Sequence, residues 1–324
     1  MPFLPPNAKP SALIWIDGVV YTTSSGDCGA APNAVWAMDL TAPAGERKTK
    51  VWDTGGATVA GTSGLSFGTD GTIYVALGTA ARGAVHADSI VALDRETLIP
   101  KDWFTAPGAD FNATPMVVRH RDKDLIVATA NDGRLYVLDA ASLGGSDHKT
   151  PLASTATYTA AGAGTALATF QDEDGSRWIF TTASGTSGDV KFTQNGPATA
   201  GRIVAFKLID EAGKVSLAPG WQSRDLVSPL APIVVNGMVI AVSSGEYRGN
   251  PGSDPDQTRN AVQCAQRSVP AVLYVLDAAT GKTLWSSGTG ITSFARGGLS
   301  AGGGQVYLVT YDNHLYAFGI PLEH

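Results

Sequence analysis

The chain has 324 residues, of which 44% are hydrophobic and 16% charged, and its formal net charge is −6. The apolar fraction is too high for a disordered chain, and the excess of acidic over basic residues, 29 to 23, disfavours a nucleic-acid-binding protein. The longest apolar runs have about six to eight residues, far fewer than the roughly 20 that a membrane-spanning helix needs, so we expect no membrane span.

The first residues, Met1–Leu4, contain neither the basic segment nor the apolar run of a signal peptide. Either an exported precursor has lost its signal or the sequence is part of a longer chain. The last three residues, 322–324, are either native or the remnant of a tag. The two cysteines, Cys28 and Cys264, stand in loops and in no zinc or haem spacing. They are either two unpaired thiols or a disulfide formed in an oxidising compartment, and we hypothesise that they pair.

Short apolar runs with a common pattern recur along the chain. The pattern begins with a hairpin, such as 13–21 and 233–240, in which Asp-Gly or Asn-Gly separates two apolar runs. An aromatic and apolar run then follows, which usually ends in Asp and is often followed by a turn and a Trp. The copies of this second run are 35–39, 90–94, 135–139, 203–207, 273–277 and 315–319.

Each repeat therefore predicts four antiparallel strands. We count six repeats, and no stretch has the sustained 3.6-residue period of a helix. Small four-stranded sheets repeated every 40 to 50 residues or so are typical of a β-propeller. We therefore predict an all-β chain, most simply one six-bladed propeller domain over residues 1–321. Its expected blades are 7–54, 55–107, 108–158, 159–224, 225–288 and 289–321.

The sixth repeat lacks an outer strand. The Pro-rich segment 2–9 is one possible donor, because Pro is tolerated at a sheet edge. The other possibility is that the chain is the C-terminal part of a longer, eight-bladed protein.

Polar residues at the starts of the inner strands are expected to face the propeller axis. They either solvate a water-filled channel or bind a polar ligand or a cation. These channel candidates are Thr62, Asp110, Asn112, Ser228, Ser293 and Arg296.

Loops between the second and third strands of successive repeats should emerge on one face, which is often the binding face of a repeat protein. Asp254 and Asp256 have the spacing of a calcium loop but lack the rest of an EF-hand, and the histidines have no metal-binding spacing, so we predict no metal site. The rim candidates are Asp27, Glu246, Tyr247, Arg248, Asp254, Asp256 and Arg267.

The run 275–285 resembles the repeat of pyrroloquinoline-quinone-type (PQQ-like) propellers, Ala-x-Asp-x-x-Thr-Gly-Lys-x-x-Trp, and departs from it only at Val275. In that family the Asp and Thr are bonded within the turn before the outer strand, the Gly takes a positive φ and the Trp docks on the next blade. The resemblance implies these roles for Asp277, Thr280, Gly281 and Trp285.

Quinoprotein dehydrogenases of this family bind PQQ and calcium under a ring of adjacent cysteines. This chain has no adjacent cysteines and no haem motif. Membership of the family names a fold and not an activity. We therefore expect a bacterial, periplasmic or secreted scaffold, monomeric and without an obvious catalytic constellation, that binds a small polar ligand or a protein. The alternative is a PQQ- and calcium-dependent alcohol or polymer dehydrogenase, or a C-terminal fragment of one. A hydrolase or lyase of the calcium-propeller kind is a third candidate, supported only by scattered carboxylates.

Overall fold

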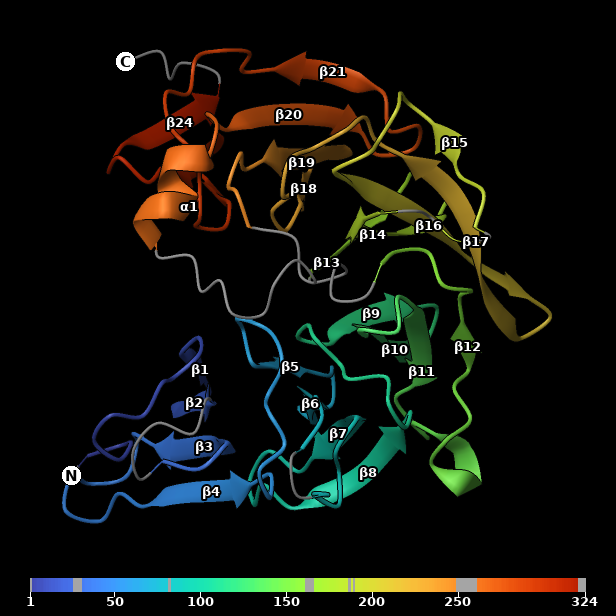
Figure 1. Ribbon diagram of the computed structural model, residues 1–324. Coiled ribbons are helices and arrows are strands. Elements are labelled where there is room, and N and C mark those ends of the chain that lie inside the picture. Colours follow the sequence, from blue (N-terminus) through green and yellow to red (C-terminus); the bar gives the residue numbers. More distant parts are fainter. Residues whose placement is uncertain are drawn as a thin grey trace. The chain divides into compact units, whose positions relative to one another are not determined.

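The computed structural model describes residues 2–25, 31–80, 83–160, 166–185, 188, 190–248 and 261–319 (Figure 1). The chain divides into two compact units, residues 1–165 with 210–216 and residues 166–209 with 217–324, which we treat separately. Strands dominate both units. In the described ranges, no helix is long and apolar enough to cross a membrane.

The first unit holds three antiparallel sheets of four strands each, and in each sheet the strands follow one another in chain order. The first sheet comprises β1 (Ile14–Ile16), β2 (Val19–Ser24), β3 (Ala34–Asp39) and β4 (Thr49–Asp53). The second comprises β5 (Leu65–Phe67), β6 (Ile73–Leu77), β7 (Ser89–Leu93) and β8 (Pro100–Thr105). The third comprises β9 (Met116–His120), β10 (Lys123–Thr129), β11 (Leu135–Asp139) and β12 (Ala153–Ser154), with the 3₁₀ turn η1 (Gly145–Asp147) before β12.

The remaining three sheets belong to the second unit, apart from the tip of one hairpin, 210–216. The fourth comprises β13 (Leu167–Gln171), β14 (Arg177–Ser184), β16 (Gly201–Glu211), β17 (Lys214–Gln222) and β15 (Thr193–Gln194), in that spatial order. The fifth comprises β18 (Ile233–Val235), β19 (Met238–Ser243), β20 (Val272–Asp277) and β21 (Thr283–Ser286). The sixth comprises β22 (Ser300–Gly302), β23 (Gln305–Val309) and β24 (Leu315–Gly319), and α1 (Ala261–Arg267) lies between β19 and β20 in the chain.

The all-β prediction is therefore confirmed, with two local differences. The fourth sheet gains a fifth strand because β15, in a long loop insertion, pairs parallel with β17. The insertion is held there by Asn195, whose side-chain amide donates to the carbonyl oxygens of Gln222 (3.1 Å) and Thr280 (2.9 Å). The helix α1 was not predicted, because seven residues are too few to show a helical period. The single-domain assignment and its blade boundaries stay a prediction.

The apolar core lies between neighbouring sheets and not in one central layer. Tyr74, Phe104 and Tyr136 belong to a cluster shared by the second and third sheets, and Phe180 and Trp221 to one shared by the fourth and fifth. Aromatic side chains thus fill the space between sheets. Burial of each of them stabilises the folded state by roughly 1.5–3 kcal/mol.

The turns show why the repeat pattern requires particular residues. Asp17 and Gly18 both have positive φ (49° and 82°), as do Asn236 and Gly237 (47° and 74°), which is the geometry expected for two-residue hairpins. In the turn before β21, Asp277 Oδ1 accepts hydrogen bonds from the backbone N–H (2.8 Å) and the hydroxyl (2.7 Å) of Thr280.

Replacing Thr280 by valine should lower the free energy of unfolding by about 0.5–1.5 kcal/mol, because it removes one hydrogen bond to a carboxylate while keeping the side-chain volume. Thr283→Val, at an exposed position on β21 outside the turn, is the matched control. Chemical denaturation of both variants measures the difference, and equal losses would show that the hydroxyl of Thr280 does not stabilise the turn.

Candidate functional site

Three of the channel candidates lie in the first unit. Asp110 and Asn112 belong to one hydrogen-bond network, in which Asp110 accepts from the side-chain amide of Asn131 and from the backbone N–H of Thr79 (2.9 Å). Asn112 donates to Asn131 Oδ1 (2.8 Å) and accepts from the Thr129 hydroxyl (2.9 Å). Both side chains therefore bond within the protein itself. Thr62 is exposed, and its carbonyl accepts from the N–H of Ala12.

Seven other predicted residues come together at the loops of the fifth and sixth sheets, all within the second unit. We call this group the loop cluster. It consists of Ser228, Glu246, Tyr247, Arg248, Arg267, Ser293 and Arg296.

The backbone around Glu246 is held from several sides. Gly245, two residues after the end of β19, has φ +71°, and a Cβ there would approach the Val269 carbonyl oxygen to 1.9 Å, so glycine is required. The hydroxyl of Ser228 donates to the Glu246 carbonyl (2.8 Å), and the N–H of Tyr247 donates to Ser268 Oγ (2.9 Å). The position of the cluster is thus determined by the fold rather than by flexible side chains.

Glu246 is the electrostatic centre of the loop cluster. Its largely buried carboxylate lies between two half-exposed guanidiniums, with Oε1 2.5 Å from Arg296 Nε and Oε2 2.9 Å from Arg248 Nε. A third guanidinium, that of Arg267, lies over the ring of Tyr247 at 5.4 Å. Among the described residues of the cluster, three guanidiniums therefore accompany one carboxylate, which gives this part of the cluster a positive excess on a chain whose net charge is −6.

Besides its ion pair with Glu246, Arg296 contacts a pair of aromatic rings. Phe294 and Tyr311 stack with ring centroids 4.5 Å apart, and the Arg296 guanidinium lies 5.7 Å and 5.4 Å from their centroids. A guanidinium that is stacked and paired in this way is a pre-oriented donor for carboxylate or phosphate oxygens.

A groove of about 430 Å³ adjoins the loop cluster, and we call it the rim groove. Its walls include Val262 and Ala265 of α1, Val269, and the same Phe294 and Tyr311 that support Arg296. Val262, Val269 and Tyr311 are exposed although they are apolar or aromatic, which is the composition of an interaction surface.

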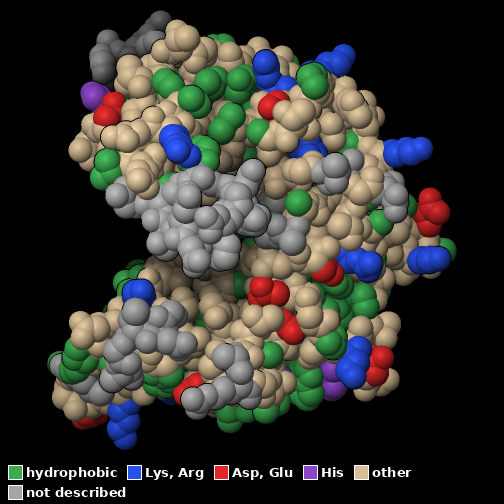
Figure 2. All heavy atoms as spheres, viewed as in Figure 1, with side chains coloured by type: hydrophobic (Ala, Val, Ile, Leu, Met, Phe, Trp, Pro, Cys, Tyr) green, Lys and Arg blue, Asp and Glu red, His purple; other side chains and the backbone are tan. Residues whose placement is uncertain are grey.

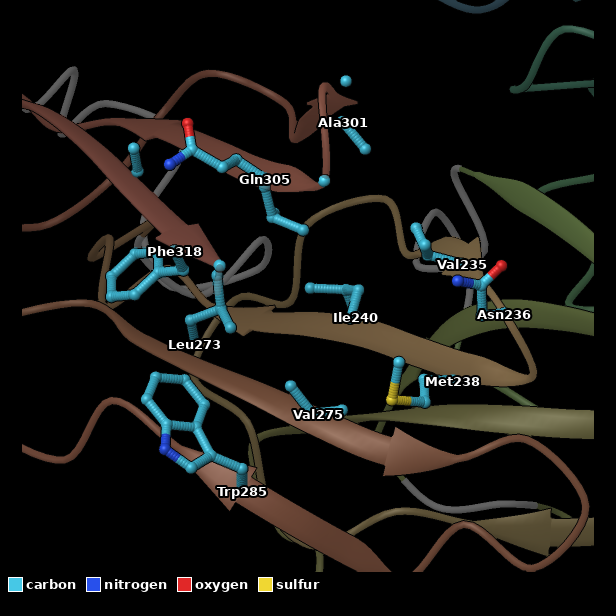
Figure 3. Close-up of a pocket in the computed structure, with 15 residues that line it drawn as sticks. Val235, Asn236, Met238, Ile240, Leu273, Val275, Trp285, Ala301, Gln305 and Phe318 are labelled. Carbon is cyan, nitrogen blue, oxygen red and sulfur yellow. The ribbon is translucent and has the colours of Figure 1, made fainter. Parts of the chain in front are cut away.

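A larger pocket of about 880 Å³, which we did not predict, lies between the fifth and sixth sheets (Figure 3). Its labelled side chains are mostly apolar, and Trp285, Val275 and Leu273 line it together with Phe318 of β24. Within the described residues, β24 is paired only with β23. The missing outer strand in the sixth repeat is the sequence signal that could have found this pocket.

Some predicted residues lie outside the described ranges, namely Asp27, Cys28, Asp254 and Asp256. Cys264 lies on α1, and because Cys28 lies outside the described ranges, its pairing with Cys28 stays a prediction. Over the described ranges, no three His, Cys, Asp or Glu side chains are placed to hold a metal ion together. On the face drawn in Figure 2, the visible Lys and Arg side chains are interspersed with Asp and Glu.

No protein-family model matches the chain, and no curated protein matches it in sequence. Solved structures do match it. The Dos1 propeller aligns with a TM-score of 0.56 at 14% identity, covering 96% of this chain and 70% of that one. The C-terminal WD40 domain of Sif2 aligns at 0.54 and 12% identity, covering 98% and 69%.

The quinohemoprotein alcohol dehydrogenase from Comamonas testosteroni aligns at 0.50 and 15% identity, covering 94% of this chain and 57% of that one. Together with the six small, almost entirely antiparallel sheets of the described residues, these likenesses confirm the β-propeller fold.

Proposed function

We propose that this chain is a PQQ-like propeller that acts as an extracytoplasmic binding scaffold, and that the loop cluster is its binding surface. A small polar ligand or a protein partner carrying negative charge would bind there. The observation that carries the proposal is the pairing of Arg248 and Arg296 with the single carboxylate of Glu246, which aligns two half-exposed guanidiniums side by side.

The chemistry of the cluster favours binding over catalysis. Each arginine guanidinium donates in a fixed planar fork that suits carboxylate and phosphate oxygens. Both carboxylate oxygens of Glu246 are already engaged by the two arginines, so this carboxylate serves as their ion-pair partner. The membership of the PQQ-like family is supported by the repeat at 275–285, where the turn bonds between Asp277 and Thr280 are present.

The binding surface is tested with labelled poly-L-glutamate as an anionic probe, measured by fluorescence anisotropy at low and physiological salt. The double variant Arg248→Gln/Arg296→Gln should bind at least tenfold more weakly than the wild type, because two charge-assisted contacts are lost. The matched control is Arg95→Gln/Arg134→Gln, which removes the same charge from exposed arginines of the first unit.

Comparison of the two double variants distinguishes binding of the probe at the loop cluster from nonspecific electrostatic attraction to any arginine. The control should bind within about twofold of the wild type, since Arg95 and Arg134 are not part of the loop cluster and pair with other carboxylates. Equal weakening of both variants would contradict the proposal.

The alternative, a PQQ- and calcium-dependent dehydrogenase, is tested by a separate measurement. The purified chain is incubated with PQQ and Ca²⁺, and alcohol-dependent reduction of a dye is followed. Our proposal predicts no turnover above the level of PQQ and Ca²⁺ alone, whereas sustained turnover would favour the alternative.

A further inference from the structure

The rim groove and the loop cluster share the same two aromatic rings. Phe294 and Tyr311 form a wall of the groove and also lie under the Arg296 guanidinium. When one part of a ligand fills the groove, an adjacent part of the same ligand can therefore contact the guanidiniums. An apolar subsite and a cationic subsite meet at one aromatic pair.

We infer that the partner recognised here is an acidic peptide segment that carries a bulky apolar side chain beside its carboxylates. This inference rests on the proposed function of the loop cluster. The apolar side chain would occupy the rim groove, and flanking Asp or Glu carboxylates would bind Arg296, Arg248 and Arg267.

The walls of the groove support the apolar half of the inference. The groove volume of about 430 Å³ falls within the roughly 300–1,000 Å³ typical of ligand pockets. Val262 is 61% exposed, and Val269 and Pro270 extend the apolar wall. A ligand side chain that covers these groups would remove apolar surface from water, and this burial favours binding.

Charge complementarity supports the acidic half. Glu246 already shows how a carboxylate is held between two arginines, and the positive excess of the cluster would attract further carboxylates.

Both subsites are held in place before any ligand binds. Ser268 Oγ accepts from the Tyr247 N–H (2.9 Å) and donates to the Cys264 carbonyl (2.9 Å), which connects the helix of the groove to the backbone of the cluster. The Val269 N–H donates to the Gly245 carbonyl (2.9 Å). Such pre-organisation lowers the entropic cost of binding.

The test uses three synthetic peptides of equal length and fluorescence anisotropy with the intact chain. The first has acidic residues around a central Leu-Trp pair, the second replaces that pair by Gly-Ser, and the third keeps the pair but replaces the acidic residues by Gln. We expect the first peptide to bind at least tenfold more tightly than either of the others.

A pair of variants locates the apolar contact. Val262→Gln should weaken binding of the first peptide about fivefold and leave the second unchanged. Val85→Gln, at an exposed valine of the first unit, is the matched control and should change neither. Both positions are exposed, so neither variant is expected to unfold the protein.

The outcomes separate the inference from the proposed function. If the second peptide binds as tightly as the first and Val262→Gln changes neither, the acidic-apolar partner is wrong while the anionic binding surface stands. Tighter binding of the third peptide, or of a single-stranded DNA oligonucleotide of matched charge, would also overturn the inference. If neither the peptides nor poly-L-glutamate bind, the proposed function itself is wrong.

Discussion

Replacement of Trp221 by alanine should lower the free energy of unfolding by about 3–5 kcal/mol, the usual cost of removing a large aromatic side chain from a core. Trp221 stands on β17 and is 1% exposed. Its ring packs against Phe180 and against Gly281 of the next sheet, and its indole N–H donates to the Ala278 carbonyl (2.9 Å). The substitution therefore leaves a cavity and an unsatisfied carbonyl between two sheets.

The same position in the next repeat supplies the matched control. Trp285 on β21 is 47% exposed and contacts Phe318 at 5.9 Å between ring centroids. Trp285→Ala should therefore cost no more than about 1 kcal/mol, because much of its surface is already in water. Urea denaturation of both variants measures the difference. Equal losses would show that the packing between the fourth and fifth sheets is not tighter than that between the fifth and sixth.

Replacement of Asp124 by alanine should lower the free energy of unfolding by about 1.5–3 kcal/mol, because hydrogen bonds to a charged group are lost. Asp124 is a buried residue of β10 in the third sheet. Its Oδ2 accepts from the N–H (2.7 Å) and the hydroxyl (2.8 Å) of Thr69 in the second sheet, and its Oδ1 pairs with Arg119 (3.4 Å).

Asp39 is the matched control for Asp124. It accepts similar bonds from the N–H (2.8 Å) and hydroxyl (2.6 Å) of Thr41, but it is exposed and connects residues of a single turn. Water can replace those bonds, so Asp39→Ala should destabilise the protein less than Asp124→Ala. A loss for Asp124→Ala no larger than that of the control would mean that the contact between the second and third sheets is not stabilising.

The contribution of Asp124 should also depend on pH. Burial acts to raise the pKa of Asp124, but the bonds from Thr69 and the charge of Arg119 outweigh it and hold that pKa below its ordinary value. The folded state thus binds this proton less readily than the unfolded state, so the stabilisation is complete above the unfolded pKa of about 4 and is lost as pH falls through the folded pKa. The difference in unfolding free energy between wild type and Asp124→Ala should therefore be larger at pH 7 than at pH 3. A difference that does not change with pH would contradict the ionised carboxylate as its source.

The parts of the fold that could be predicted from the sequence depend on contacts between near neighbours. Asp17-Gly18 and Asn236-Gly237 specify hairpins because these residues tolerate positive φ, and the aromatic runs identify the strands that face the next sheet. The strand β15 and the helix α1 could not be predicted in this way. The strand is too short to show a period, and its pairing with β17 depends on Asn195, which bonds to residues 27 and 85 positions away.

For the candidate site too, individual residues could be predicted from the sequence, but the contacts between distant residues could not. Sequence reasoning could name Glu246 and Arg248, because insertions at equivalent places in a repeat emerge together. It named Arg296 separately, as a residue at the start of an inner strand that faces the propeller axis. It could not pair Glu246 with Arg296, 50 residues further along the chain, nor find the aromatic pair beneath that arginine. It also could not separate Asp110, whose carboxylate bonds to neighbouring loops, from residues whose side chains reach solvent.

The amino-acid sequence by itself determined the all-β class, the six repeats and the turn chemistry, since these follow from hydrogen bonds and side-chain alternation within a few residues. Only the tertiary structure decided which loops meet and which tryptophan is buried. Those outcomes depend on the distance between segments that lie tens of residues apart, and no local pattern of side chains encodes that distance.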